Sequence, residues 1–145
     1  MRYQKGLSLL EVLITLVILA VGLLGLAGLT AAAMRNNHGS HNRTQAVWLA
    51  YDITDRMRAN RPAAQAGQYN IALTGTPPSA GTAAQTDLNQ WVAAVARLPE
   101  GQGAVNYDNA TRRITITVQW NETRAAGSAA EAGDANRQFV VQSQI

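Results

Sequence analysis

The chain has 145 residues, of which 47% are hydrophobic and 14% charged, with no cysteine and a formal net charge of +3. This length is typical of one domain, and the high apolar content excludes a disordered acidic or basic tail. The lack of cysteine excludes a disulfide framework, a thiolate zinc site and a cysteine nucleophile, and a charge of +3 is too small by itself to indicate nucleic-acid binding.

The apolar residues are concentrated in one segment near the N-terminus, Leu7–Met34. From Val12 onward this segment has no charged residue, and as a helix it would be roughly 35 Å long, enough to cross a hydrocarbon core of about 30 Å. Arg2 and Lys5 precede it, so the positive-inside rule places the N-terminus in the cytoplasm and the rest of the chain across the membrane. We therefore expect a single-pass transmembrane helix.

Two simpler interpretations of this segment compete with a functional transmembrane helix. Ala31, Ala32 and Ala33 resemble the small-residue site of a cleaved secretory signal, but the apolar run before them is longer than the usual span of about 7 to 15 residues. A plain membrane anchor is the stronger alternative, because the hydrophobicity of the segment by itself indicates no function beyond anchoring.

One acidic residue, Glu11, lies at the head of this apolar run. A carboxylate deep in a membrane span costs about 2.5 to 3.5 kcal/mol even on lenient insertion scales, so Glu11 needs a cationic partner. A cut after Gly6 would free an amine on Leu7, one helical turn away, where the positive end of the helix dipole also favours the carboxylate. The residues leave equally open a glutamate near the membrane surface that snorkels or stays protonated.

The stretch Lys5–Val12, with the short basic leader before it, resembles the cleavage signature of type IV prepilins and of the pseudopilins of type II secretion. The resemblance implies that a prepilin peptidase cuts after Gly6 and methylates the new N-terminus on Leu7. It also implies that Glu11, the fifth residue of the mature chain, is a subunit assembly contact. The sequence departs from the signature at Leu7, where the family usually has phenylalanine.

The first helix is predicted to continue well beyond the membrane. No proline occurs between Leu7 and Arg61, so one helix of about 80 Å could run until Pro62. Poor helix formers around Gly39 predict fraying or a kink there. Beyond that point, residues at three- and four-residue steps predict a core-facing side, made of Val47, Ala50, Tyr51, Ile53 and Met57 and widened by Trp48 and Leu49.

The rest of the chain, after Arg61, is predicted to form a small head. Residues 63–86 are predicted to be mostly connection, with a short strand at 69–73, and Thr86 is expected to cap a second helix. Strands are predicted at Val105–Tyr107, Arg113–Trp120 and Gln138–Ser143. The expected fold class is α+β and pilin-like, with a long N-terminal helix packed on a small antiparallel sheet.

We therefore expect four parts. These are a leader of residues 1–6 removed by the peptidase, a transmembrane or fibre-core half of the helix at 7–34, a periplasmic half at 35–61, and a globular α+β head at 62–145.

Parts of the head resemble PilV-type minor pilins, namely Asp55–Asn60 and the stretch from Leu88 through Leu98–Gly101 to Trp120. This resemblance implies a structural subunit that takes part in initiating or modifying type IV pilus assembly. The implied partners are other minor pilins, the major pilin, the prepilin peptidase, the inner-membrane assembly platform and membrane lipid. The implied location is the inner membrane with the C-terminal domain in the periplasm, and then the pilus or cell surface.

Two other functions compete with that of a minor pilin. A minor pseudopilin of type II secretion has the same leader, so the leader cannot distinguish it from a pilin. A DNA-binding pilin for uptake would need a basic patch, but the part from Arg35 onward has 10 arginines against 8 acidic residues, a net +2 that favours a mixed solvated surface. We therefore expect DNA not to be a partner.

No catalytic, cofactor or metal site is expected. His38 and His41 are three residues apart, but no carboxylate lies near them in the sequence, and a metal site there is disfavoured. No nucleophile elbow or glycine-rich phosphate loop occurs, so the protein is expected not to be an enzyme. Trp91 and Trp120 are expected in the core rather than in a ligand platform.

Overall fold

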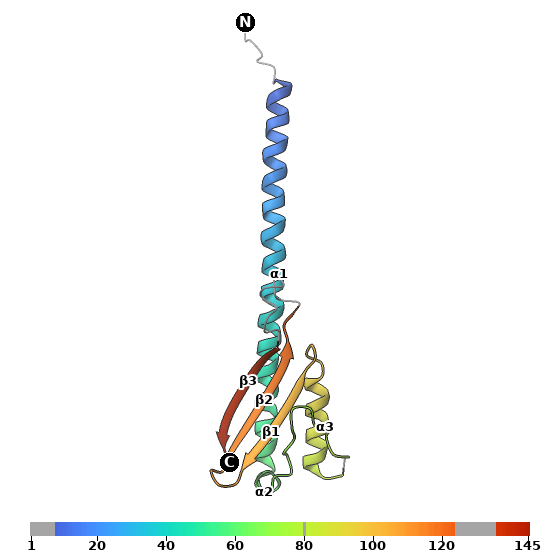
Figure 1. The fold of residues 1–145 in the computed structure, drawn as a ribbon, viewed down its shortest axis with the longest axis vertical. Helices are drawn as coiled ribbons and strands as arrows, with labels where there is room; N and C mark the ends of the chain where they lie inside the picture. The colour runs from blue at the N-terminus through green and yellow to red at the C-terminus, as the bar shows by residue number, and fades with distance from the viewer. Residues whose placement is uncertain (1–7, 80, 124–135) are drawn as a thin grey trace.

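The computed structural model describes residues 8–79, 81–123 and 136–145, without the side chains of residues 35–38. It shows a long helical rod that carries a small head around its second half (Figure 1), and this arrangement confirms the expected α+β class. The elements in chain order are α1 Leu9–Ala59, α2 Arg61–Gln65, α3 Ala83–Val95, β1 Gln102–Asp108, β2 Arg113–Asn121 and β3 Asn136–Gln144.

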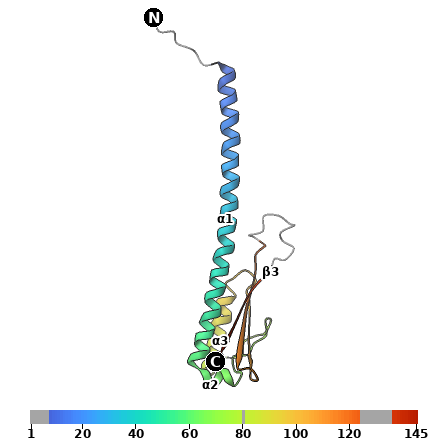
Figure 2. The ribbon, with the colours of Figure 1, turned by 90° about the vertical axis from the view of Figure 1, so that its left-hand side faces the viewer.

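The rod is α1, one helix of 51 residues that is about 76 Å long at 1.5 Å per residue. The helix ends at Ala59, next to Pro62 in the first turn of the short α2. The fraying or kink expected near Gly39 is wrong, because α1 passes through this residue without interruption (Figures 1 and 2). A glycine costs a helix only about 1 kcal/mol relative to alanine, and helical turns on both sides spare this segment the cost of nucleation.

The three strands form an antiparallel sheet with β2 in the centre. Ile116 of β2 lies opposite Val105 of β1 and Val141 of β3. The predicted alternation of β2 is confirmed, because its buried side chains are Ile114, Ile116, Val118 and Trp120. The short strand predicted at 69–73 is reduced to one bridge, between Ile71 and Val105. A turn follows that bridge at once, closed by the Gly75 N–H on the Ala72 carbonyl at 2.8 Å.

The head packs on one side of the second half of α1, with α3 and the sheet against it (Figure 2). The α1 residues that the core takes are Ala46, Ala50, Ile53 and Met57, all fully buried. The prediction that this face includes Tyr51 and is widened by Trp48 is wrong, because the exposed fractions of these side chains are 51% and 71%. The small Ala46 and Ala50 select the packed face because they let neighbouring elements approach the helix axis. Since successive residues are 100° apart on a helix, Trp48 then points away from the head.

Trp91 of α3 joins the layers of the head. Its indole Nε1 donates to the backbone carbonyl of Leu49 in α1 at 2.8 Å. Its ring lies where a side chain at Gly103 of β1 would be, so even an added methyl group there would overlap with it. One buried residue thus contacts both helices and the sheet, and the expectation that Trp91 and Trp120 belong to the core is confirmed.

The start of α3 differs from the prediction. The N-cap is Thr82 rather than Thr86, and its hydroxyl accepts from the Gln85 N–H at 3.3 Å. The Gln85 side chain in return accepts from the Thr82 N–H at 3.0 Å. Two free N–H groups are satisfied by this reciprocal capping box, whereas Thr86 lies in the first turn and donates its hydroxyl proton to the Thr82 carbonyl.

A polar cluster links α1, α3 and the segment between them. Asp87 accepts from Arg56 at 3.2 Å and from the Tyr69 hydroxyl at 2.6 Å, and Asn60 donates to that hydroxyl at 3.3 Å. Arg56 also pairs with Asp52 at 3.1 Å. Burial and the hydrogen bond to Asp87 raise the pKa of Tyr69 to about 12, because both disfavour the charged phenolate.

This raised pKa predicts that the head loses stability at high pH. An unfolded tyrosine has a pKa of about 10, so between about pH 10 and 12 the unfolded chain releases a proton that the folded head retains. The contribution of Tyr69 is complete below about pH 10 and lost by about pH 12, on the order of 3 kcal/mol at about 1.4 kcal/mol per pKa unit. Denaturant unfolding of the full chain in uncharged detergent across this range measures it. Tyr69→Phe should remove this loss and the exposed Tyr51→Phe should keep it; equal slopes in the two variants would contradict the assignment.

Candidate functional site

The N-terminal end of α1 holds those predicted site residues that the structure describes. Ser8 is the N-cap, with an extended backbone at φ −71° and ψ 141°, and its Oγ accepts from the Leu10 N–H at 3.3 Å. Its carbonyl accepts from the N–H groups of Glu11 and Val12 at 3.0 and 3.2 Å. The chain thus enters the helix one residue after Leu7. The predicted cleavage and methylation residues, Gly6 and Leu7, lie outside the described residues.

Glu11 lies in the first turn of α1, with its side chain exposed. Within the described part of the chain, its carboxylate makes no hydrogen bond or ion pair. The positive end of the helix dipole lies beside it and favours a negative charge at this position. The carboxylate is therefore open to a cationic partner from the residues before Ser8 or from another chain.

The sequence analysis missed the role of Ser8, although a signal for it exists. Ser8 and Glu11 have the spacing of a capping box, in which the acid would bond back to the N-cap N–H. The structure forms only half of this motif, since the Ser8 hydroxyl bonds the Leu10 N–H while Glu11 does not return to Ser8. Ser8 therefore caps the helix by itself, and the Glu11 carboxylate takes no part in the cap.

The apolar half of α1, residues 9–34, extends away from the head with nothing of the described chain around it (Figures 1 and 2). Its large aliphatic side chains are between 43% and 83% exposed. Apolar surface of this extent is strongly disfavoured in water, and the helix is long and apolar enough to cross a membrane. This is compatible with a single-pass membrane anchor.

The polar hydroxyls within the apolar half fit the same surroundings. Thr15 donates to the Val12 carbonyl at 2.8 Å, and Thr30 donates to the Leu26 carbonyl at 2.9 Å. A hydroxyl that bonds within its own helix needs no water, so neither threonine opposes burial in hydrocarbon. Glu11 is the one acidic or basic residue of this half.

Three glycines, Gly22, Gly25 and Gly28, form a small-residue stripe in the apolar half. Among the residues that the structure describes, a Cβ atom added at any of them would meet nothing within 4 Å, so no contact with this part of the chain explains glycine there. Close packing against a neighbouring helix and the ordinary glycine enrichment of membrane helices both account for the stripe.

The other candidate groups are the two histidines and the arginines. His41 is exposed and the side chain of His38 lies outside the described residues, where we also find Arg124. Over the residues that the structure describes, no group of three potential metal ligands occurs. Arg56 pairs with Asp52 and Asp87, Arg58 with Asp55, and Arg137 with Glu122. These ion pairs neutralise three of the ten arginines from Arg35 onward that a DNA-binding patch could draw on.

Comparison with known proteins identifies one family model, the prokaryotic N-terminal methylation motif, which matches residues 1–27. The match covers Gly6, Leu7, Glu11 and most of the apolar half of α1. No curated protein and no solved structure matches the chain. The N-terminal region is therefore prepilin-like, of the kind found in type IV pilins and pseudopilins. For the head, the structure described above is the only basis for an interpretation.

Proposed function

We propose that the chain is a minor pilin of the PilV type, a structural subunit that takes part in initiating or modifying type IV pilus assembly. The observation that carries the proposal is the continuity of two features. The methylation motif of residues 1–27 leads directly into a helix whose apolar half is uncovered while its second half is packed in a folded head. Such a chain needs an apolar environment at one end and water at the other.

The apolar half explains how the subunit would move from membrane to filament. Before assembly, residues 9–34 lie in the inner membrane and the head lies in the periplasm. In a filament, the same surface packs against the helices of other subunits, so the side chains exchange lipid for protein without entering water. The assembly platform supplies the extraction step, and the other minor pilins and the major pilin supply the new surroundings.

Glu11 explains how the helix would be placed against its neighbour. Removal of residues 1–6 exposes the amine of Leu7, one turn before Glu11, and this amine is the cation that the uncovered carboxylate lacks. In apolar surroundings a correctly placed pair is strongly favoured over a misplaced one, because an unpaired charge there costs several kcal/mol. The function is assembly rather than catalysis.

Mass spectrometry of the N-terminus of the native protein tests the processing step. We expect a chain that begins at Leu7 with one methyl group on its amine. A chain that keeps Met1, or one that begins near Ala33, would contradict the proposal, because neither places an amine one turn before Glu11.

Substitution of Glu11 tests the assembly contact. Glu11→Ala and the isosteric Glu11→Gln should both leave cleavage largely intact and reduce incorporation into pili, because each removes the negative charge. Thr15→Ala, one turn further along α1, is the matched control and should incorporate normally, because its hydroxyl bonds only within its own helix. Normal pilus number together with normal subunit content in Glu11→Gln would refute the role of the charge.

A minor pseudopilin of type II secretion is the second candidate, because the methylation motif is common to both classes. Deletion of the chain distinguishes them. We expect loss of piliation and of twitching motility with protein secretion unchanged, whereas loss of exoprotein release with normal twitching would assign the chain to the secretion system.

A further inference from the structure

The described residues of the head expose three large apolar side chains, and these lie on two opposite sides of it. They are Trp48, Tyr51 and Val140, with exposed fractions of 71%, 51% and 50%. Trp48 points away from the core, because the buried Ala46 is about 200° from it around the helix. Val140 lies on the face of the sheet that points away from α1, since its neighbours in β3 pack against the core. Figure 2 shows α1 and the sheet on opposite sides of the head.

On α1, the exposed side forms a narrow stripe. Its members are His41, Thr44, Trp48, Tyr51 and Asp55, and we call it the bare stripe. Steps of three and four residues keep these side chains within about 80° of one another around the helix. Thr44 bonds to a carbonyl of its own helix, and Asp55 bonds to the neighbouring Arg58. The spacing is that of a helix face that packs on a neighbour, but no part of the described head covers it.

On the other side of the head, the outer face of the sheet has no charge in its middle. Three rows of side chains cross β1, β2 and β3 there, and we call them the neutral sheet face. The rows are Gln102, Gln119 and Gln138; Ala104, Thr117 and Val140; and Asn106, Thr115 and Gln142. Every side chain of the middle row carries a methyl group, so this row offers an apolar surface to an aromatic ring.

One arginine, Arg113, lies at the end of the neutral sheet face that is nearer to α2. Its guanidinium donates to Gln142 at 3.4 Å and has no ion pair in the described chain. Asp108 lies opposite Arg113 in β1, but its carboxylate accepts from the Ala110 N–H at 2.9 Å and from the Thr111 hydroxyl at 2.7 Å. Arg113 is therefore open to a carboxylate from outside the head.

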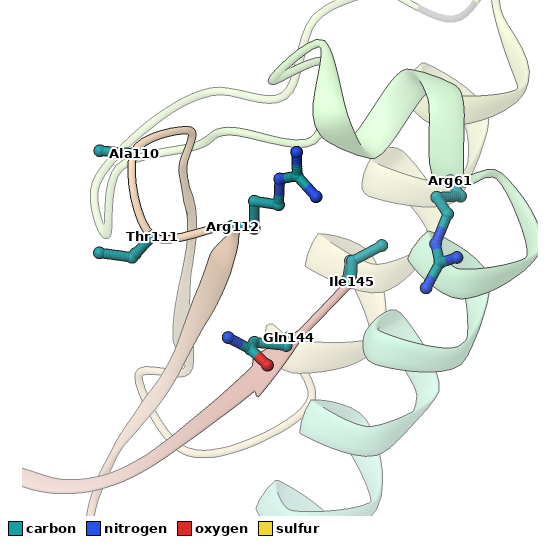
Figure 3. A pocket seen from close by; sticks show the side chains of 6 residues that line it. All are labelled: Arg61, Ala110, Thr111, Arg112, Gln144 and Ile145. Atoms are coloured by element: carbon teal, nitrogen blue, oxygen red, sulfur yellow. The ribbon is translucent and has the colours of Figure 1, made fainter.

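The end of the head limits this face. A hollow of about 430 Å³ lies there, between Arg61 of α2 and the turn that joins β1 to β2 (Figure 3). It shares no residue with the neutral sheet face. The two exposed apolar surfaces are therefore the sides of the head, not its end.

The bare stripe and the neutral sheet face lie at similar heights along the rod. Arg58 donates to the Ser143 hydroxyl at 3.0 Å, which places α1 and β3 at one level there, and both run toward the same end of the head (Figure 1). Trp48 is ten residues before Arg58, or about 15 Å along the helix. Val140 is three residues before Ser143, or about 10 Å along the strand. Trp48 and Val140 thus differ in height by only about 5 Å.

The charges follow in the same order on both surfaces. Asp55 is seven residues after Trp48, about 10 Å further along α1. Arg113 lies opposite Gln144, which is four residues after Val140 and about 13 Å further along β3. A surface that brings Trp48 onto Val140 therefore also brings the carboxylate of Asp55 close to a guanidinium.

We propose that the bare stripe of one chain packs on the neutral sheet face of a second, parallel copy of this chain. Trp48 covers the middle row, and Asp55 pairs with Arg113. Copies held in one membrane or one filament point the same way, so a sideways shift brings the two surfaces together. Because the chains are already held side by side, a small contact is sufficient. The inference rests on the proposed function only for this parallel orientation, and it holds for a pilin and for a pseudopilin.

This contact is head-to-tail, since it joins different surfaces of the two copies. Each added chain leaves one bare stripe and one neutral sheet face free, so the contact repeats from chain to chain. The competing arrangement joins stripe to stripe. A two-fold pair of parallel helices places each residue opposite its own copy, and the two Asp55 carboxylates would then repel each other. The neutral sheet face presents no acid to Asp55 and ends in Arg113.

Disulfide cross-linking of the full chain in the membranes of its native host tests the contact. The chain has no cysteine of its own, so each introduced thiol is unique. Thr44→Cys lies one turn before Trp48 on the bare stripe, and Gln138→Cys lies two residues before Val140 on the neutral sheet face. Oxidation of the two co-expressed single variants should link them into a dimer, and the double variant should form a ladder of multimers.

The matched control pairs Thr44→Cys with Arg97→Cys. Arg97 is exposed but belongs to neither surface, so this pair should give no dimer. A dimer from Thr44→Cys alone would show stripe against stripe and would overturn the proposal, as would equal yields from the control pair.

Two further substitutions separate a direct contact from mere proximity. Trp48→Ala should slow formation of the dimer about tenfold or more, as removal of a central tryptophan does at protein interfaces. Asp55→Arg should slow it as well, and Arg113→Asp in the other chain should restore it. Trp48 and Asp55 are exposed, so neither change disturbs the core of the head. An unchanged rate in Trp48→Ala, or no bond at all in a normally piliated cell, would overturn this inference and leave the proposed function standing.

Discussion

One constraint governs this molecule: a single unbroken helix has to be stable in two different surroundings. The first half of α1 exposes aliphatic side chains on all sides, whereas the second half is covered on one side by a head that buries Ala46, Ala50, Ile53 and Met57. A helix tolerates this change of medium because its backbone hydrogen bonds are internal. A sheet or loop could not serve in the same place, since it would leave backbone groups unpaired in hydrocarbon.

The head is built to hold that second half firmly. Trp91 fixes α3 to α1 through the Leu49 carbonyl and fills the space above Gly103 of β1. The cluster of Arg56, Asp87 and Tyr69 connects the same helices at the edge of the core. Apolar packing and hydrogen bonding thus act on one pair of helices, so that a force applied along α1 would be transmitted to the whole head.

Strong periodicities made much of this fold predictable from the sequence. The long apolar run, the absence of proline before Pro62 and the two-residue alternation of β2 each depend on local chemistry alone. Trp48 and Tyr51 were wrongly placed on the core-facing side of α1, because the side that is buried depends on which elements pack against the helix, and the helical periodicity alone does not show this. Thr82 was missed for a different reason: the capping glutamine three residues later was present in the sequence, and Thr86 was chosen one turn too late.

The candidate site was likewise predictable from the sequence only in part. Glu11 was predictable because a charge in an apolar run is conspicuous, and the structure adds that Ser8 caps the helix while the carboxylate makes no bond among the described residues. Gly6 and Leu7 lie outside those residues and stay predictions.

The outward position of Trp48 has a practical consequence. The chain has three tryptophans; Trp91 and Trp120 are at most 1% exposed, while Trp48 stands on the bare side of α1 at 71%. A quencher dissolved in water therefore dims the emission of one indole and spares two. Trp48 is therefore an intrinsic fluorophore on the helix surface. A second chain packed along this side of α1 would protect its indole from the quencher, so the contact could be followed without an added label.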